Sequence, residues 1–420
     1  MSKNVLLIGT LDTKGREYAY VRDLIEARGL RTFVLDAGVL GEPTFTPNSP
    51  ASRTAQAAGG SLAELREKRD RGYALEVMGR GARALAAELV AAGDIDAVFA
   101  MGGSGGTSIG STAMQALPVG LPKLIVSTMA SGNVAPYVDV KDITMMYSVV
   151  DVAGLNRVSR RVFANAAGAI SGMAEQDLPN VQQKPLVAAT MFGVTTPCVD
   201  RMRARIEDAG YEMLVFHAVG SGGRSMESLI ADGFVAGVAD VTTTEWCDEL
   251  VGGVLSAGPD RLDAAARTGV PQVVSVGALD MVNLGPRDTV PEQFRDRNIY
   301  VHNPQVTLMR TTPGECKRLG EIIAGKLNRT TGPTAFFIPL KGVSMIDAEG
   351  MPFHDPAADA ALFGALRKDL DRAKVELVEL DMHINDPAFA DAMADRLLAM
   401  LEQSRPAATQ AEPALAGSER

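Results

Sequence analysis

The sequence has few cysteines and lacks the patterns of a disulfide-bonded or metal-thiolate protein. Its three cysteines, Cys198, Cys247 and Cys316, lie far apart, include no Cys-x-x-Cys spacing and leave one thiol over under any pairing. This usage is typical of a reducing compartment and argues against both a disulfide framework and a thiolate zinc site. No run of about 18 apolar residues and no signal-peptide pattern occurs. We therefore expect a soluble, cytoplasmic protein without a membrane partner.

Basic residues are also fewer than acidic residues. The 41 Lys and Arg residues face 51 Asp and Glu residues, a formal net charge of −10. This balance argues against nucleic acid as the main partner, because a phosphate backbone requires a basic face. The sequence contains no Gly-x-x-x-x-Gly-Lys-Ser/Thr or His-Glu-x-x-His motif, and no Gly-x-Gly-x-x-Gly follows the first predicted strand. Walker-type nucleotide binding and zinc peptidase chemistry therefore have no support, and a dinucleotide site has little.

What is present is a globular composition, with 46% hydrophobic and 22% charged residues in 420. A chain of this length is expected to fold as more than one domain. A polar segment, 175–185, contains Pro179 and Pro185, lacks periodicity and predicts the boundary. We expect an N-terminal domain over 1–180, a C-terminal domain over 185–403 and a disordered Ala/Pro/Glu tail over 404–420.

The N-terminal part alternates predicted strands with predicted helices. Residues 5–10 form an apolar run typical of a buried parallel strand, 11–15 a polar turn, 18–28 a helix and 30–36 a second strand. In such a βαβ unit the turn after the first strand lies at the carboxyl edge of the sheet, where ligands bind. Four residues of this turn are candidates to face a ligand: Thr10, Asp12, Thr13 and Lys14. Asp12 could hold Mg²⁺ through water and Lys14 could reach a phosphate; alternatively, Asp12 or Thr13 only caps the helix.

A glycine-rich stretch follows the predicted strand at 97–101 and leads into a helical pattern from about residue 111. It supplies six candidate residues: Gly102, Gly103, Ser104, Gly105, Gly106 and Thr107. Glycines allow the backbone N–H groups to approach a ligand closely, and the positive end of the following helix favours an anion. The stretch predicts a nucleotide phosphate site, and a simple tight turn is the alternative.

A third predicted strand, 124–129, also ends in small and hydroxyl residues. These are Ser127, Thr128, Ser131, Gly132 and Asn133. The strand ends at Thr10, Gly102 and Ser127 converge if their strands are neighbours. Such a convergence would be a more specific signal than any one loop.

The second half repeats the order of the first. A strand at 185–191, a turn, a helix at 199–209 and a strand at 211–217 match residues 4–38 in order and length, which suggests two related α/β domains. A second glycine loop, 220–225, carries Arg224, whose guanidinium could hold a carboxylate or phosphate.

Three of the four histidines lie in predicted loops of the second half. His302, His354 and His383 each have a polar neighbour, and Arg310 lies close to the first in sequence. A histidine beside a carboxylate is a common general base or metal ligand, and Asp381 has that spacing to His383. These residues are candidate catalytic groups. Alternatively, they bond within their loops, or a metal binds to Asp381, His383 and His354.

The motifs together resemble the ATP-binding family named after the tomato mosaic virus resistance protein. The resemblance rests on residues 9–15, 102–107, 127–132, 193–197, 271–283, 302–304 and 383–387. It implies an α/β fold with two Rossmann-like three-layer subdomains and mainly parallel sheets, ATP bound by the N-terminal subdomain, and a homodimer. In the plant protein the corresponding region binds a viral replication protein, so the resemblance also implies that a protein partner is an option.

Two hypotheses about function follow. In the first, an ATP- and Mg²⁺-dependent enzyme of kinase or ligase type acts on a small carboxylate or hydroxy acid in a cleft between the domains. Arg224 and Arg310 would clamp this substrate, and His302 or His383 would act as base. In the second, the protein is a nucleotide-regulated protein-binding module without turnover.

Overall fold

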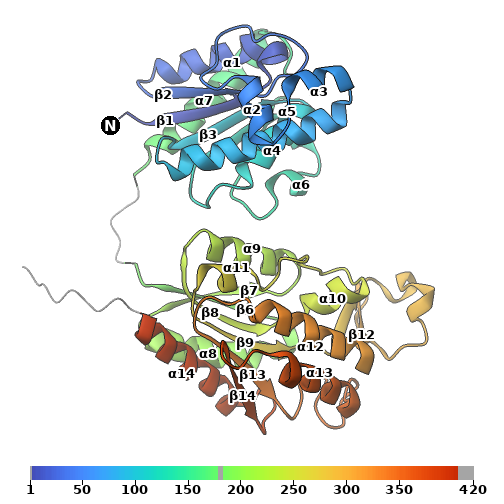
Figure 1. Cartoon of the computed structure of the whole chain (residues 1–420). Helices are drawn as coiled ribbons and strands as arrows, with labels where there is room; N and C mark the ends of the chain where they lie inside the picture. The colour runs from blue at the N-terminus through green and yellow to red at the C-terminus, as the bar shows by residue number, and fades with distance from the viewer. Residues whose placement is uncertain (1, 178–182, 405–420) are drawn as a thin grey trace, which may run out of the picture. The chain divides into compact units, whose positions relative to one another are not determined.

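The chain consists of two compact units, Met1–Val181 and Gln182–Arg420, in a computed structural model that describes residues 2–177 and 183–404 (Figure 1). The centre of the predicted boundary segment lies outside the described residues. So does the predicted tail, apart from Ser404, which ends the last helix. Among the described helices, none is long and apolar enough to span a membrane.

The N-terminal unit is a five-stranded parallel sheet with helices on both faces (Figure 1). The strands lie in the order β2-β1-β3-β4-β5. Their bounds are β1 Asn4–Gly9, β2 Arg31–Asp36, β3 Ala97–Gly102, β4 Lys123–Ser127 and β5 Thr144–Tyr147. The helices are α1 Leu11–Glu26, α2 Ala51–Ala57, α3 Leu62–Lys68, α4 Arg71–Ala91, α5 Ser104–Met114, α6 Ala135–Val138 and α7 Arg157–Glu175. A 3₁₀ turn, η1, spans Thr128–Ser131.

Alternating side chains of β1 separate the two cores of this unit. Val5 and Leu7 pack with α1 and α7, whereas Leu6 and Ile8 pack with α2, α4 and α5. This two-sided burial explains why the strand reads as a continuous apolar run. Because β1, β3 and β4 are adjacent, the predicted convergence of their carboxyl ends is confirmed.

Two helices begin earlier than the sequence predicts. The expected polar turn at 11–15 is wrong, since α1 starts at Leu11, whose N–H donates to the buried Asp36 carboxylate at 3.0 Å. The expected glycine loop is also wrong in extent, because α5 starts at Ser104 and includes Gly105 and Gly106. Gly106 permits this start, as a Cβ there would lie 2.9 Å from the Met101 carbonyl oxygen.

Tyr18 of α1 ties this edge of the sheet together. Its hydroxyl donates to the carbonyl oxygen of Ile8 at 2.5 Å and accepts from the Met101 N–H at 2.7 Å. Burial raises the pKa of this phenol well above its usual range. A Cβ on Gly9 would lie 2.1 Å from the Tyr18 ring. The glycine therefore permits the close packing of α1 on β1 and β3.

The C-terminal unit repeats this topology. Its six-stranded parallel sheet has the order β7-β6-β8-β9-β13-β14, whose first five positions follow the order of the N-terminal sheet. The strands are β6 Leu186–Met191, β7 Glu212–His217, β8 Val235–Thr242, β9 Gln272–Gly277, β13 Thr334–Pro339 and β14 Val375–Leu380. The related α/β architecture predicted for the second half is confirmed.

Helices cover both faces of this sheet too, with α8 and α14 on one face and α9 to α13 on the other (Figure 1). They span α8 Thr196–Asp208, α9 Ser221–Ala231, α10 Glu245–Val251, α11 Ala264–Thr268, α12 Pro313–Leu327, α13 Pro356–Asp369 and α14 Pro387–Ser404. A small antiparallel sheet, β10-β12-β11, consists of Met281–Leu284, Val306–Arg310 and Ile299–Asn303. Short 3₁₀ turns follow β6, at Gly193–Thr195, and β10, at Arg287–Thr289 and Glu292–Phe294.

Candidate functional site

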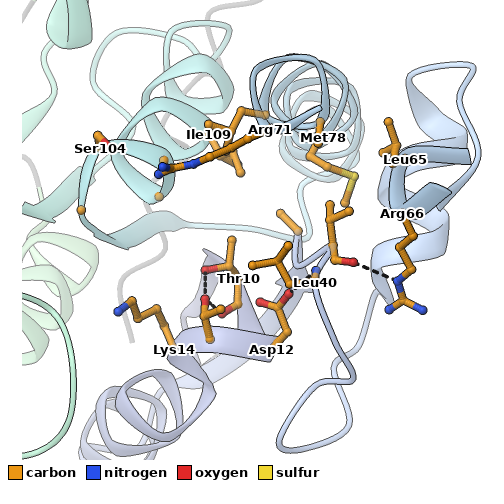
Figure 2. Close-up of a pocket in the computed structure, with 18 of the residues that line it drawn as sticks. Thr10, Asp12, Lys14, Leu40, Leu65, Arg66, Arg71, Met78, Ser104 and Ile109 are labelled. Carbon is orange, nitrogen blue, oxygen red and sulfur yellow. Dashed lines mark hydrogen bonds between the residues drawn. The ribbon is translucent and has the colours of Figure 1, made fainter. Parts of the chain in front are cut away.

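A cavity of about 860 Å³ opens at the carboxyl edge of the N-terminal sheet (Figure 2). It lies where the chain order of the strands reverses, between the ends of β1 and β3. Open α/β sheets bind ligands at this switch point, and the volume is within the range of small-molecule sites. The cavity belongs entirely to the N-terminal unit.

Eight of the predicted binding residues line this cavity. They are Thr10, Asp12, Thr13, Lys14, Gly103, Ser104, Gly105 and Gly106. The first four come from the end of β1 and the first turn of α1, the others from the first turn of α5. Two helix N-termini thus meet at one hollow, which favours a bound anion.

The other predicted binding residues do not line the cavity. They are Gly102, Thr107, Ser127, Thr128, Ser131, Gly132 and Asn133. Thr107 and Ser127 are buried, and their hydroxyls bond to each other at 2.6 Å. Thr107 also donates to the Gly103 carbonyl oxygen at 2.8 Å. These two hydroxyls support the start of α5 and are not placed to contact a ligand in the cavity.

The Asp12 carboxylate bonds to the backbone of the segment that follows β2. Its Oδ2 accepts from the N–H groups of Leu40 and Gly41 at 2.7 and 3.2 Å. Its Oδ1 is buried without a partner, against Gly38, where a Cβ would lie 2.7 Å from that oxygen. This geometry does not fit the predicted magnesium ligand, because Oδ2 already accepts two backbone hydrogen bonds and Oδ1 is buried. Asp12 instead positions residues 38–41.

Sequence reasoning missed the basic residues of the cavity. Arg66 and Arg71 line it from α3 and α4, and Arg69 lines it from the position directly after α3. Arg66 holds residues 39–42 through Val39 O at 2.9 Å, Gly41 O at 2.8 Å and the Glu42 carboxylate (Figure 2). Within the described ranges, Lys14, Arg69 and Arg71 form no ion pair. The cluster Arg66 to Arg71 was the signal that could have revealed them.

Apolar side chains also line the cavity. They are Ala37, Val39, Leu40, Leu65, Ala74, Leu75, Met78 and Ile109. Leu40 is 86% exposed. The lining of the cavity thus combines cationic and apolar side chains.

The segment Gly102-Gly103-Ser104-Gly105-Gly106 also fits the Gly-x-Ser-x-Gly pattern of hydrolase nucleophiles at a strand-to-helix turn. In a hydrolase of the Ser-His-Asp type, the serine requires a histidine base within hydrogen-bond reach. Residues 1–181 contain no histidine. Ser104 therefore lacks the base within its own unit.

The second glycine loop is filled by the protein itself. The Glu245 carboxylate, at the start of α10, accepts from the N–H groups of Gly220 and Gly223 at 2.7 and 3.1 Å. A Cβ on Gly223 would lie 2.2 Å from Oε2 of that carboxylate. The prediction that this loop binds a substrate anion is therefore wrong in this structure, because an internal carboxylate occupies the cradle. Arg224 lies exposed on α9.

Arg310 is buried among carboxylates, 4% exposed. Its Nη2 donates to Asp347 at 3.0 Å and to Asp359 at 2.7 Å, and its Nε donates to the Phe353 carbonyl oxygen. The predicted substrate clamp is therefore wrong for this residue. The sequence could not show this, because both aspartates lie more than 35 positions away from it.

Asp280, Asp347 and Asp359 surround this single guanidinium. Burial raises the pKa of Asp347 to about 9, and the charges of Asp280 and Asp359 add to the effect. Burial also raises the pKa of Asp280 to about 6. Asp280 is fully buried, its Oδ2 accepts from the Ser344 hydroxyl at 2.7 Å, and its Oδ1 has no partner.

We expect the stability of the C-terminal unit to fall as pH rises from 6 to 9. The folded unit keeps a proton on Asp347 that the unfolded chain releases above its ordinary pKa near 3.9, so unfolding is favoured at higher pH. The limiting slope is about 1.4 kcal/mol per pH unit for each such proton. Urea unfolding followed by the fluorescence of Trp246, the single tryptophan, measures it.

Asp347→Asn should flatten this dependence, and Asp381→Asn, at an exposed ion pair with Lys341, should leave it unchanged. A wild-type midpoint that stays constant from pH 6 to 9 would contradict the prediction.

Two of the three loop histidines, His354 and His383, contact the same turn at 344–347. Both ring nitrogens of His383 are engaged: Nδ1 accepts from the Asn385 N–H at 3.1 Å, and Nε2 donates to Ser344 O at 2.9 Å. His354 contacts the Asp347 carbonyl oxygen, and His302 is exposed on β11. Across the described residues, no group of three or more His, Cys, Asp or Glu side chains is arranged to hold a metal ion. The predicted base role of His383 does not fit its contacts.

Comparison with models of protein families shows the family of this chain. Residues 3–179 match the N-terminal domain, and residues 184–401 the C-terminal domain, of an uncharacterised protein family, UPF0261. The chain belongs to the UPF0261 family. A UPF0261 protein of Clostridium tetani is 53% identical over 96% of this chain and 100% of its own length. Another from Rhizobium meliloti is 51% identical over 93% and 97%.

The family resemblance inferred from the sequence motifs is also confirmed. The ToMV resistance protein Tm-1 of Solanum lycopersicum is 39% identical over 96% of this chain, which corresponds to 56% of the tomato protein. Among solved structures, a Streptomyces glycosyltransferase complexed with thymidine diphosphate aligns over 96% of both chains at 14% identity, with a TM-score of 0.19. A score this low carries no argument about this UPF0261 member.

Proposed function

We propose that the N-terminal unit of this UPF0261 protein binds ATP in the cavity between β1 and β3. The observation that carries the proposal is the contrast between the two glycine-rich helix starts. The one at α9 holds a carboxylate of its own chain, which demonstrates that such a cradle takes an anion. The one at α5 lines an open cavity beside unpaired cations.

The cationic and apolar side chains of the cavity match the two ends of a nucleotide. The N-termini of α1 and α5, the hydroxyls of Thr10 and Thr13, and Lys14 would hold the phosphates. Leu65 and Met78 would pack against the base. The family resemblance implies ATP among nucleotides, and the geometry supports a ligand with one anionic and one apolar end.

Magnesium would accompany the phosphates. Asp12 does not fit as its ligand, because its carboxylate bonds to the backbone at 40–41. Asp70 and Asp151 are exposed carboxylates that line the cavity, and Asp70 caps α4. We therefore do not assign Asp12 as a ligand of Mg²⁺.

Calorimetric titration of the full-length chain tests the proposal, with ATP, ADP, AMP and GTP as ligands, each with and without Mg²⁺. Saturable binding of ATP is the expected result. Absence of ATP binding at millimolar concentration would refute it.

The contacts in the C-terminal unit favour a nucleotide-regulated binding module over an enzyme. Two of the residues expected to act on a substrate are Arg310 and His383. Their side-chain nitrogens form hydrogen bonds within the protein. The names of the tomato relatives refer to virus resistance or susceptibility and not to a reaction. The ToMV susceptible protein tm-1 is 38% identical to this chain, and the resistance protein is 39% identical. Resistance therefore cannot be transferred to this chain by likeness.

A turnover assay separates the two functions. Purified protein incubated with ATP, Mg²⁺ and a panel of small carboxylates and hydroxy acids is expected to release no ADP, AMP or phosphate. ATP affinity should survive His302→Ala, since His302 is exposed on β11 of the other unit. Release of ADP or AMP that depends on one added acid would restore the enzyme hypothesis.

A further inference from the structure

Arg71 reaches the phosphate end of the cavity from a helix that sequence reasoning did not assign to the site. It is the first residue of α4, directly after Asp70, whose carboxylate caps the helix by accepting from the Tyr73 N–H at 3.0 Å. Its Nη2 lies 3.8 Å from the position that a Cβ on Gly105 would occupy. Figure 2 shows the side chain extending from α4 toward the start of α5, near Ser104.

Three of the neighbouring cations are engaged in ways that Arg71 is not, whereas Lys14 and Arg69 also lack an ion pair within the described residues. Arg66 bonds to residues 39–42, the Lys68 ammonium lies 3.7 Å from the centre of the Tyr73 ring, and Arg80 pairs with Glu76 at 2.7 Å. Among the described residues, Arg71 has no carboxylate partner. A guanidinium held beside two helix N-termini without a counterion favours binding of an anion.

The helix start at α5 cannot balance a polyphosphate alone. A helix N-terminus carries about half an elementary charge, whereas each further phosphate of a nucleotide adds roughly one negative charge. Lys14 approaches the same hollow from α1, and Arg71 approaches it from α4 (Figure 2). The need for Arg71 should therefore grow with the number of phosphates.

We propose that Arg71 is the residue that makes this cavity prefer a nucleoside triphosphate over a monophosphate, by binding the phosphate farthest from the base. The inference rests on the proposed ATP site and adds to it a specificity-determining residue. The planar guanidinium can donate two parallel hydrogen bonds to a phosphate, which a lysine cannot reproduce. Gly105 leaves the space through which the two groups meet.

Calorimetry with the full-length chain tests the assignment, using ATP, ADP, AMP and inorganic tripolyphosphate as probes. Arg71→Met should weaken ATP by about tenfold or more, since a charge-assisted bond is worth about 1.5–3 kcal/mol. AMP affinity should change less than threefold, roughly, because AMP lacks the phosphate concerned. Arg71→Lys should recover only part of the loss. Arg80→Met, on the same helix in an exposed ion pair, is the matched control and should bind all probes as the wild type does.

The outcomes separate this inference from the proposed function. If ATP binds to the wild type and Arg71→Met weakens ATP and AMP equally, or weakens neither, the inference is overturned and the ATP site stands. If the wild type binds tripolyphosphate through Arg71 but not ATP, the nucleotide assignment fails and the anion-binding role of Arg71 stands. If it binds neither, both fail.

Discussion

Gly105→Asp is expected to abolish ATP binding, with a loss of affinity of roughly a hundredfold or more. The new Cβ would lie 3.2 Å from Leu75 Cδ2, a tight contact that a small shift of this flexible side chain relieves, and the carboxylate would reach the Arg71 guanidinium. An internal anion would then occupy the cradle, as Glu245 does at the start of α9. Losing two charge-assisted phosphate contacts of about 1.5–3 kcal/mol each accounts for the predicted size.

Two controls make this test specific. Gly105→Ala adds bulk without charge and should reduce affinity only slightly. Gly172→Asp places the same residue on α7, where nothing lies within 4 Å of the new Cβ, and should bind ATP normally. Thermal unfolding of each variant verifies that the unit stays folded. Unchanged ATP affinity in folded Gly105→Asp would place the nucleotide elsewhere.

The sequence was sufficient to predict the sheets but not the start of every helix. Apolar runs such as 5–8 predict buried strands because both sides of a parallel sheet are covered by helices. The starts at Leu11 and Ser104 depend on contacts with distant residues. Asp36 accepts the Leu11 N–H, and the close approach of Gly106 to Met101 fixes α5. Polar and glycine residues favour turns locally, and tertiary packing overrides that preference here.

The dependence on contacts with distant residues also explains which site residues were predicted. Thr10, Lys14 and Gly103 were found because strand ends in a βαβ unit must meet at one edge. Arg71 was missed because it does not follow a strand. The basic cluster Arg66 to Arg71 was visible in the sequence, but its place beside the cavity depends on how α4 packs on the sheet. Arg310 was misjudged for the opposite reason. Its partners Asp347 and Asp359 come from later segments and remove it from solvent.

Arg261→Met is expected to lower the unfolding free energy of the C-terminal unit by about 3–5 kcal/mol, the usual cost of removing one partner from a buried ion network. Arg261 is 1% exposed, and its guanidinium bonds to Asp240 at 2.5 and 2.7 Å and to Glu245 at 2.7 Å. Without it, two nearly fully buried carboxylates lose their counterion. Glu245 is also the acceptor that satisfies Gly220 and Gly223, so the start of α9 should loosen as well.

Trp246 reports the loss of stability near the ion network, because this single tryptophan follows Glu245 directly and is 5% exposed. Urea unfolding followed by its fluorescence should show an early transition in Arg261→Met. Arg367→Met, which breaks the exposed pair with Glu379, should unfold as the wild type does. Should Arg261→Met fail to fold, Glu245→Gln still tests the network, because it keeps an acceptor for the two glycine N–H groups and removes only the charge. A wild-type transition in both variants would mean that the filled cradle contributes nothing to stability, and the contrast with the open cradle at α5 would lose its physical basis.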